Sequence, residues 1–534
     1  MEIVFGWSLD GLAYPENARR CTDSFNSQLV GPLSFLSLLE TRLGLRGPSV
    51  PRAVRIADYL SMLALASKDV TQFYSASFSA DAWGTADHLL SMRDELIASG
   101  WNGATIDPAR SEPDGVEKLN ALARVEKSGT ISAGFGERIQ TVNTRLAARI
   151  QSSNKLLIDS VRIIEPLRLL PQIWQETLNL LAESGSKIEQ VPALPKALTI
   201  ASTSTSSRST SSDLQILQEC LLQTRSSRSS GSSKTLNEVQ LSNVEKRELS
   251  GDGTVSVIDA DDEIQAAFFT AAWLAQRSNR ADLVLLRGAD CSMLAQACDH
   301  YSLPSPGSTA RLQFKAILQV LPLAFKLACR PLDPNIMMEF ASIQGGPLPR
   351  FVAQNLIYSI SQAPGIDSAF WNEAWQKSLN SQKSFTSKDH PELTNTEVVE
   401  ASAKKIEEQR NWFKERVAPS ERRMKKSDAE EICSRIEKWA MSRSPDENRA
   451  LYELAAGQSK MLRQLIAQLR DESICLIQLR KMIESVTSYG SSVSTADAAD
   501  WSLVDKAGQI WDAAPTILWW GFAQSQWSVP RASI

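Results

Sequence analysis

Short apolar runs rich in β-branched residues recur along this chain, and their placement constrains its fold more than any other feature of the sequence. They occupy residues 2–6, 155–166, 187–192, 254–260, 281–290 and 515–522. Runs of this length beside turn residues are typical of buried strands. Long amphipathic patterns separate them, as helices between strands would. The sequence therefore predicts an α/β fold of two units, each carrying a large helical insertion.

The amphipathic patterns predict where the helices lie. The first hundred residues are expected to be mainly helical after the opening strand, with helices from Ala53 to Leu65 and from Thr85 to Ile97. A further helix is predicted to begin after Gly31 and to end at Gly44. Its apolar face, which is expected to pack on the core, is formed by Leu33, Leu36, Leu39 and Leu43. Residues 312–494 are expected to be almost entirely helical.

Several charged groups are interpreted as ordinary helix features. Asp94 and Glu95 are expected to be exposed helix residues, and Asp261 and Asp262 to cap the helix that follows them. The charged run at 404–417 is interpreted as a solvated helix face with ion pairs between residues four apart. None of these groups is assigned a catalytic role.

Residues 201–234 are dominated by Ser and Thr, interrupted by a helical pattern at 213–222. Such a composition cannot bury enough apolar area to offset the entropy lost when a chain becomes ordered. We therefore interpret this stretch as a surface linker. A nucleic-acid-binding tail of alternating Arg and Ser is the alternative.

The charge balance gives no broad basic surface. Lys and Arg number 57 against 61 Asp and Glu, which leaves a net charge of −4. Binding of nucleic acid by charge alone needs a basic field over much of the protein. Any contact with DNA must therefore come from a local basic surface.

Thiol, imidazole and membrane functions have little support. The closest pair of the seven cysteines, Cys291 and Cys298, fits no metal-binding spacing, so reduced thiols and no metal site are expected. The three histidines stand beside no pattern of catalytic type. No apolar run reaches the roughly 20 residues of a membrane span. We expect a cytoplasmic protein without membrane contacts.

A glycine loop follows the first strand. Its sequence is Gly6-Trp-Ser8-Leu-Asp10-Gly11, then Leu12 and Ala13. A working phosphate-binding loop has this glycine spacing, but it also needs a Lys on the β and γ phosphates and a hydroxyl on Mg²⁺. Here both are missing, and Asp10 would place a negative charge where phosphate should lie. We predict at most a degenerate nucleotide site; the alternative is a turn kept for folding.

Taken in order, four parts of the chain resemble the AddB/RecC-like subunits of bacterial helicase-nucleases. They are the loop FGWSLDG, the helical stretches GPLSFLSLLETRLGL and FYSASFSADAWGTADHLLSMRDELIASGW, the segment from VSVIDADDEIQ to HYSLP, and TILWWGFAQSQWSVP. Each motif alone is weak, and their order and spacing supply the specificity. The likeness covers nearly the whole chain.

The resemblance implies two RecA-like domains, of the type found in P-loop NTPases, with large helical insertions. On that plan the first helicase-like domain with its insertion spans 1–200, and a Ser-rich linker with a short helix spans 201–253. The second domain begins at 254–310, is interrupted by a helical insertion at 311–495, and returns at 496–534. This division agrees with the pattern of strands and helices described above.

The resemblance also singles out residues outside the glycine loop. Arg287 corresponds to the arginine that reaches the terminal phosphate in active relatives, although a structural ion pair is expected here because the opposite loop lacks its Lys. Trp519 and Trp520 are DNA-binding candidates that could stack on bases. Packing in the core is the favoured alternative, because neighbouring residues of a strand point to opposite faces.

The function implied is that of a DNA-binding, helicase-like scaffold subunit acting with a helicase or nuclease partner on double-stranded DNA ends, in repair or defence. No cofactor is expected to be required by this chain; ATP and Mg²⁺ would act through a partner or a missing extension. The family's nuclease motif would lie beyond Ile534 or on a separate chain. The alternative is a protein-interaction module without DNA affinity, and an active ATPase is a third possibility.

Overall fold

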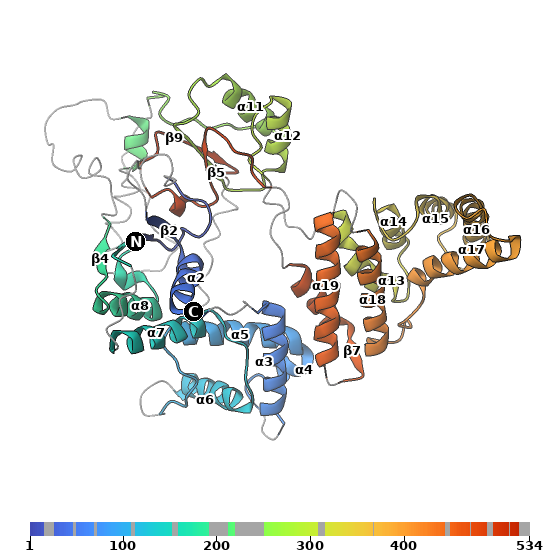
Figure 1. Cartoon of the computed structure of the whole chain (residues 1–534), viewed down its shortest axis with the longest axis horizontal. Helices are drawn as coiled ribbons and strands as arrows, with labels where there is room; N and C mark the ends of the chain where they lie inside the picture. The colour runs from blue at the N-terminus through green and yellow to red at the C-terminus, as the bar shows by residue number, and fades with distance from the viewer. Residues whose placement is uncertain are drawn as a thin grey trace, which may run out of the picture.

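The protein is a helix-rich α/β chain with small parallel sheets (Figure 1). The computed structural model describes residues 1–14, 26–45, 50–68, 72–107, 113–151, 158–191, 212–218, 250–307, 315–366, 368–443, 449–469, 471–488, 495–511 and 513–522. Two cysteines, Cys21 and Cys220, and most of the predicted linker lie outside the described residues. Within the described part of the predicted linker, residues 213–218 form the short helix that was expected there. No helix in the described ranges is both long enough and apolar enough to cross a bilayer.

The first sheet has the strand order β2-β1-β3-β4, with every pair parallel. Its strands are β1 (Glu2–Phe5), β2 (Ser27–Val30), β3 (Ser160–Ile163) and β4 (Lys187–Gln190). One face is covered by α2 (Pro32–Leu43), α7 (Phe135–Gln151) and α8 (Gln172–Glu183). Phe5, Phe35 and Trp174 pack together there with ring centroids 5.2 to 5.6 Å apart. The opposite face carries Val4 and contacts the C-terminal part of the chain through Trp511.

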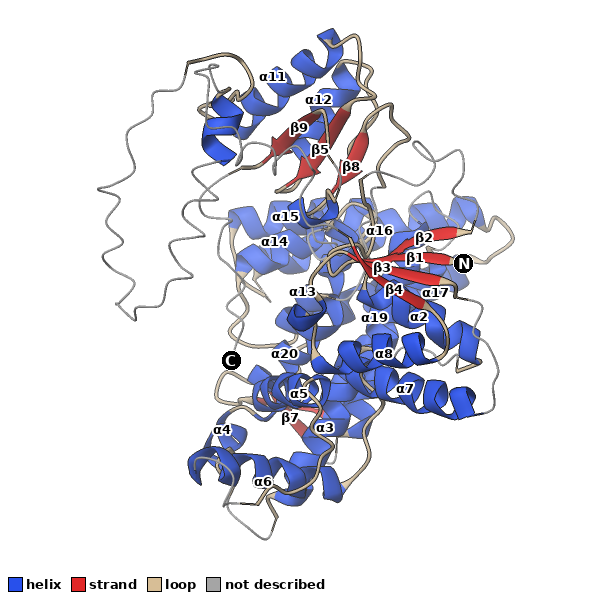
Figure 2. Ribbon diagram, turned by 90° about the vertical axis from the view of Figure 1, so that its left-hand side faces the viewer, coloured by secondary structure: helices blue, strands red, loops and turns tan. Residues whose placement is uncertain are grey.

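The second sheet has the order β8-β5-β9, again with parallel pairs. Its strands are β5 (Leu283–Arg287), β8 (Ser502–Val504) and β9 (Thr516–Trp520), and α11 (Glu263–Gln276) and α12 (Ser292–His300) cover one face. The other face receives Tyr14, which comes from the loop after β1 and packs on Val284 and Leu286. The predicted strands at 281–290 and 515–522 are confirmed, and Figure 2 shows the sheet above the first one.

One predicted strand is wrong. Residues 254–260 form no strand, and Val257 is 83% exposed. β-branched content alone does not make a strand, because a strand needs a neighbour for its backbone groups. The third strand of this sheet is instead β8, a run of three residues that the pattern did not reveal. β2 was missed as well, because only Leu29 and Val30 of its four residues are apolar.

The remaining helices form a helical body. Its first group is α3 (Arg52–Ala66), α4 (Ser75–Ala80), α5 (Ala82–Ala98) and α6 (Pro113–Ser128). Its second group is α13 (Val320–Leu327), α14 (Pro334–Ser342), α15 (Arg350–Gln362), α16 (Ala369–Asp389), α17 (Asn395–Arg410), α18 (Lys426–Ser442), α19 (Arg449–Gln468) and α20 (Leu476–Thr487). A two-stranded antiparallel ribbon joins β6 (Arg423–Lys425) to β7 (Ser473–Cys475). The predicted helices at 53–65 and 85–97 are confirmed by α3 and α5.

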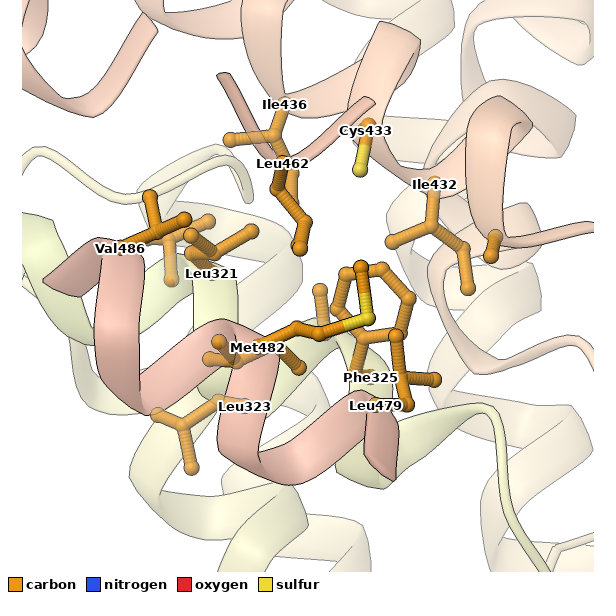
Figure 3. Close-up of a cluster of buried hydrophobic side chains, with 14 of the residues drawn as sticks. Leu321, Leu323, Phe325, Ile432, Cys433, Ile436, Leu462, Leu479, Met482 and Val486 are labelled. Atoms are coloured by element: carbon orange, nitrogen blue, oxygen red, sulfur yellow. The ribbon is translucent and has the colours of Figure 1, made fainter. Parts of the chain in front are cut away.

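The two groups of helices share one hydrophobic core, although they are far apart in sequence. Figure 3 shows part of it, where Phe325, Ile436 and Met482 converge from α13, α18 and α20. The indole nitrogen of Trp83 donates to Ser485 Oγ at 3.0 Å across the contact between the groups. The helical insertions therefore pack as one body, which their assignment to two separate domains did not anticipate.

Three side chains differ from their predicted positions. Leu33 is 62% exposed at the first turn of α2, so it does not belong to the core face. Asp94 is not a freely exposed helix residue, because Arg55 Nη1 donates to it at 2.6 Å. In the run 404–417 the helix ends at Arg410, and Arg416 pairs with Asp428 and Glu431 of α18 rather than along its own helix. The predicted cap is confirmed, since the Asp262 carboxylate accepts from Gln265 N.

Candidate functional site

The topology of the first sheet identifies one edge as the place to look for a ligand. The strand order runs from β1 to β2 on one side and from β1 to β3 on the other. In open parallel sheets, ligands bind beyond the carboxyl ends of the strands where the order reverses in this way. The loop from Gly6 to Gly11 leaves β1 at that edge, so the sequence-predicted loop lies where a nucleotide site is expected.

Asp10 already occupies the N-terminus of α2. Its carboxylate accepts hydrogen bonds from Leu33 N and Ser34 N, both at 2.8 Å. The first amides of a helix have no partner within the helix and carry partial positive charge, so they attract an anion. Here the chain's own carboxylate fills an anion-binding position of the kind that a phosphate takes at other helix N-termini. The close approach depends on Gly31, where a Cβ atom would lie 2.3 Å from Asp10 N.

The glycines of the loop serve its packing. A Cβ atom on Gly6 would lie 2.8 Å from Ile164 Cδ1, and Gly11 has a φ of +101° that favours glycine. Between them, Trp7 N donates to both carboxylate oxygens of Glu165 at 3.0 Å. The spacing of the two glycines therefore fits the path of the chain from β1 into the loop.

Gln509 joins this loop to the second sheet. Its Nε2 donates to Asp10 O at 3.3 Å, while its Oε1 accepts from Asp505 N at 2.7 Å and from Lys506 N at 3.0 Å. Tyr14 N donates to Gln509 O at 2.9 Å, which adds a backbone link. Ser8 lies against Gly508, where a Cβ atom would be 2.6 Å from Ser8 Oγ. The side chain of Gln509 is almost fully buried.

Arg287 lies on the other side of Gln509. Its Nε donates to Asp505 Oδ1 at 2.7 Å and its Nη1 donates to Pro306 O at 2.7 Å. The Arg287 side chain is only 10% exposed. This confirms the structural ion pair expected for Arg287. A chain of hydrogen bonds thus runs from Arg287 through Asp505 and Gln509 to Asp10.

The junction of the two sheets, defined by Asp10, Gly31, Arg287, Asp505 and Gln509, has little capacity for chemistry. Its charged groups are bonded to one another or to backbone, and the loop carries no Lys. Burial raises the pKa of the nearby Cys291 thiol to about 12, so it is not a nucleophile at neutral pH. No group of three or more His, Cys, Asp and Glu suited to a metal ion occurs in the described ranges. What the arrangement does is hold the two sheets together.

The two tryptophans of β9 lie on opposite faces, as expected. Trp520 is buried, and its Nε1 donates to Asp290 O at 3.0 Å. It is a core residue and is not available to stack on a base. Trp519 is 37% exposed and lies edge-on to Phe522 with ring centroids 4.9 Å apart. Of the pair, only Trp519 remains a candidate for stacking.

Sequence reasoning missed Gln509, Asp505 and Gly31, although they complete the junction. Gly31 had a signal, since it directly precedes Pro32 at the start of a helix. Gln509 and Asp505 lie in a short polar stretch after β8, and no local pattern marks them. In comparisons with known proteins, no protein-family model and no curated protein matches this chain.

Proposed function

We propose that this chain is a helicase-like scaffold subunit that binds double-stranded DNA ends and works with a separate helicase or nuclease. Its two parallel sheets correspond, in this proposal, to the two RecA-like domains of the AddB/RecC-like plan. The chain itself hydrolyses no ATP and requires no cofactor. Its localisation in this proposal is cytoplasmic.

The observation that carries the proposal is the Asp10 carboxylate on the N-terminus of α2. Helix N-termini that bind nucleotides keep their first amides open for phosphate, whereas here the chain's own carboxylate fills those of α2. A protein that keeps two parallel sheets and fills this anion position itself fits a helicase-like scaffold without ATPase activity. The pairing of Arg287 with Asp505 supports the same interpretation.

Exposed aromatic rings supply one place where DNA could be held. Trp519 and Phe522 lie at the carboxyl edge of the second sheet, and Phe522 is 63% exposed. Aromatic rings stack on the unpaired bases that fray at a duplex end, whatever their sequence. Trp519 is therefore the residue of this chain that we assign to DNA contact.

The test is binding of blunt and forked duplex ends, compared with a closed duplex circle, over a range of salt concentrations. We expect affinity for ends that falls as salt rises, because phosphate contacts release counterions. Trp519→Ala should weaken binding to forked ends more than to the closed circle. The control is Phe370→Ala, which removes an aromatic ring of similar exposure from α16. An absence of salt-sensitive binding at micromolar protein would overturn the proposal.

A second function, protein interaction without DNA affinity, is favoured by the outer face of α11. Ile264 is 55% exposed and Phe269 is 60% exposed on this helix. Apolar side chains around most of a helix are typical of a helix buried in an assembly. Co-purification with a helicase or nuclease that Phe269→Ser abolishes, in a chain with no affinity for DNA ends, would favour this function over the first.

A further inference from the structure

α11 directs its large apolar side chains away from the rest of the protein. Its buried side packs against the second sheet and α12 and consists of Ala267, Thr270, Ala271 and Leu274. Its outer side carries the larger residues Ile264, Phe268, Phe269 and Trp273. The helix lies at the upper edge of the protein in both views (Figure 1, Figure 2). A helix that serves only its own core buries its large apolar residues, so the outer side is an interaction surface.

The four outward residues form one continuous surface. Ile264 and Phe268 are four residues apart, as are Phe269 and Trp273, and residues at this spacing lie one turn apart on the same side of a helix. Tyr301, which follows α12, extends the surface, because its ring centroid lies 6.5 Å from that of Phe268. Ile264 and Phe269 are more than half exposed, so a partner can reach them directly.

The two ends of this surface carry opposite charges. Asp261, Asp262 and Glu263 are exposed at its N-terminal end, and none of them forms an ion pair with a described residue. Arg277 follows the helix at the other end. It donates to Thr516 Oγ1 at 2.7 Å and has no carboxylate partner among the described residues. A partner that fits the surface therefore carries positive charge at one end and negative charge at the other.

A second copy of α11 meets this requirement when the two helices run antiparallel. The acidic end of each helix then lies against the basic end of the other, and a two-fold axis repeats the contact. Antiparallel helix dipoles attract each other as well. A membrane surface fits less well, because helices that lie on anionic lipid present Lys and Arg to it, whereas this helix begins with carboxylates.

The charges also set the register of the two helices. Asp262 lies opposite Arg277 of the other copy when the two-fold axis passes midway between them, beside Phe269. Phe269, which is 60% exposed, then meets its own copy at the axis. In this register Trp273 lies opposite the small Ala266 of the other copy, and large residues opposite small ones allow helices to interdigitate.

We propose that two copies of this chain associate through the outer side of α11, antiparallel, with Phe269 at the two-fold axis. The proposal rests on one premise of the second function, that α11 is an interaction surface, and it does not involve Trp519. With 14 residues, the helix is about 21 Å long. One such helix from each copy covers less than the roughly 1,600 Å² of a standard interface, so the dimer forms at micromolar concentrations.

The first test is sedimentation equilibrium of the full chain from nanomolar to high micromolar concentrations, where we expect a monomer–dimer equilibrium. Phe269→Asp should weaken the dimer about tenfold or more, because it removes the central ring and places two carboxylates together at the axis. The matched control is Tyr358→Asp on α15, since Tyr358 is also 60% exposed, and it should leave the equilibrium unchanged. A chain that stays monomeric at every concentration would overturn the proposal.

A charge exchange tests the antiparallel arrangement. Glu263 and Gln276 lie at equal distances from the proposed axis, so each faces the other across it. Glu263→Lys should weaken the dimer by bringing a second cation to Arg277, and Gln276→Glu should weaken it by opposing Glu263. The double variant should recover most of the lost affinity, because Lys then faces Glu. A double variant weaker than both single variants would overturn the proposal.

The outcomes also separate this proposal from the two functions. A monomer that binds a helicase or nuclease through Phe269 contradicts the dimer and supports the second function. A dimer in a chain without affinity for duplex ends supports the present proposal and contradicts the first function. Binding of duplex ends that persists in Phe269→Asp, while the dimer is lost, supports the dimer interface and the first function together.

Discussion

The junction of the two sheets and the interior of the helical body place polar groups in opposite situations. At the junction, the Asp10 carboxylate, the Gln509 amide and the Arg287 guanidinium each have partners within the chain. In the helical body, the buried Trp439 Nε1 and Gln409 Oε1 have no hydrogen-bond partner among the described residues. Satisfied polar groups hold a structure together, whereas buried unsatisfied ones lower its stability. The comparison separates a region joined by polar contacts from one held together by apolar packing.

The largest expected effect is at Gly31. In Gly31→Ala the new methyl group would overlap Asp10, whose Cγ lies 2.4 Å from the Cβ position. We expect a loss of about 3 kcal/mol in the free energy of unfolding, the upper part of the range for overpacking. Urea unfolding followed by circular dichroism measures it.

The control for this variant is Gly457→Ala in α19, where a Cβ atom meets nothing within 4 Å. That change should stabilise the protein slightly, because Ala forms helix better than Gly. A similar loss of unfolding free energy in both variants would contradict the conclusion that the contact between Asp10 and Gly31 requires a glycine.

The next largest effect is at Arg287. Arg287→Met leaves the Asp505 carboxylate without its partner, and it also removes a donor from Pro306 O. Because Asp505 remains 39% exposed to water, we expect about 2 kcal/mol rather than the full cost of an unpaired buried charge.

Arg280→Gln is the comparison for that loss. Arg280 lies 3.6 Å from Asp500, which is 72% exposed, so its removal should cost under about 1 kcal/mol. Equal losses for the two arginines in urea unfolding would contradict a structural role specific to Arg287.

A smaller effect is expected for Asp10. Asp10→Ala should destabilise the protein by about 1 kcal/mol, the usual cost of losing a cap at a helix N-terminus. Asp10→Asn keeps an acceptor for Leu33 N or Ser34 N, so it should cost less. Hydrogen exchange at the first turn of α2 reports the change locally. Unchanged hydrogen exchange in Asp10→Ala would show that the Asp10 carboxylate does not stabilise the first turn of α2.

The smallest effect separates two buried tryptophans. Trp83 Nε1 donates to Ser485 Oγ, whereas Trp439 Nε1 has no partner. Trp83→Phe should therefore cost about 1 kcal/mol more than Trp439→Phe, which removes an unsatisfied group. Thermal unfolding of the two variants gives the difference. The reverse order would mean that the Trp439 nitrogen has a partner in solution.

The sequence alone determined those elements whose signals are local. The apolar runs of β1, β5 and β9, the helix ended by Gly44 and the cap at Asp262 were all predicted. Their backbone conformation depends on side chains within a few residues, so the pattern carries the information. An ion pair was predicted for Arg287, but its partner, Asp505, was not identified.

Tertiary structure alone decided which distant segments meet. Residues 254–260 have the composition of a strand but pair with no other strand. In contrast, Ser502–Val504 pairs with β5 although it is only three residues long. Asp94 becomes an ion-pair partner because α3 packs on α5, and Gln509 becomes a bridge because the β1 loop reaches the second sheet. The shared core of the two helical groups arises in the same way. Contacts between residues hundreds of positions apart leave no periodicity in a sequence, and only packing reveals them.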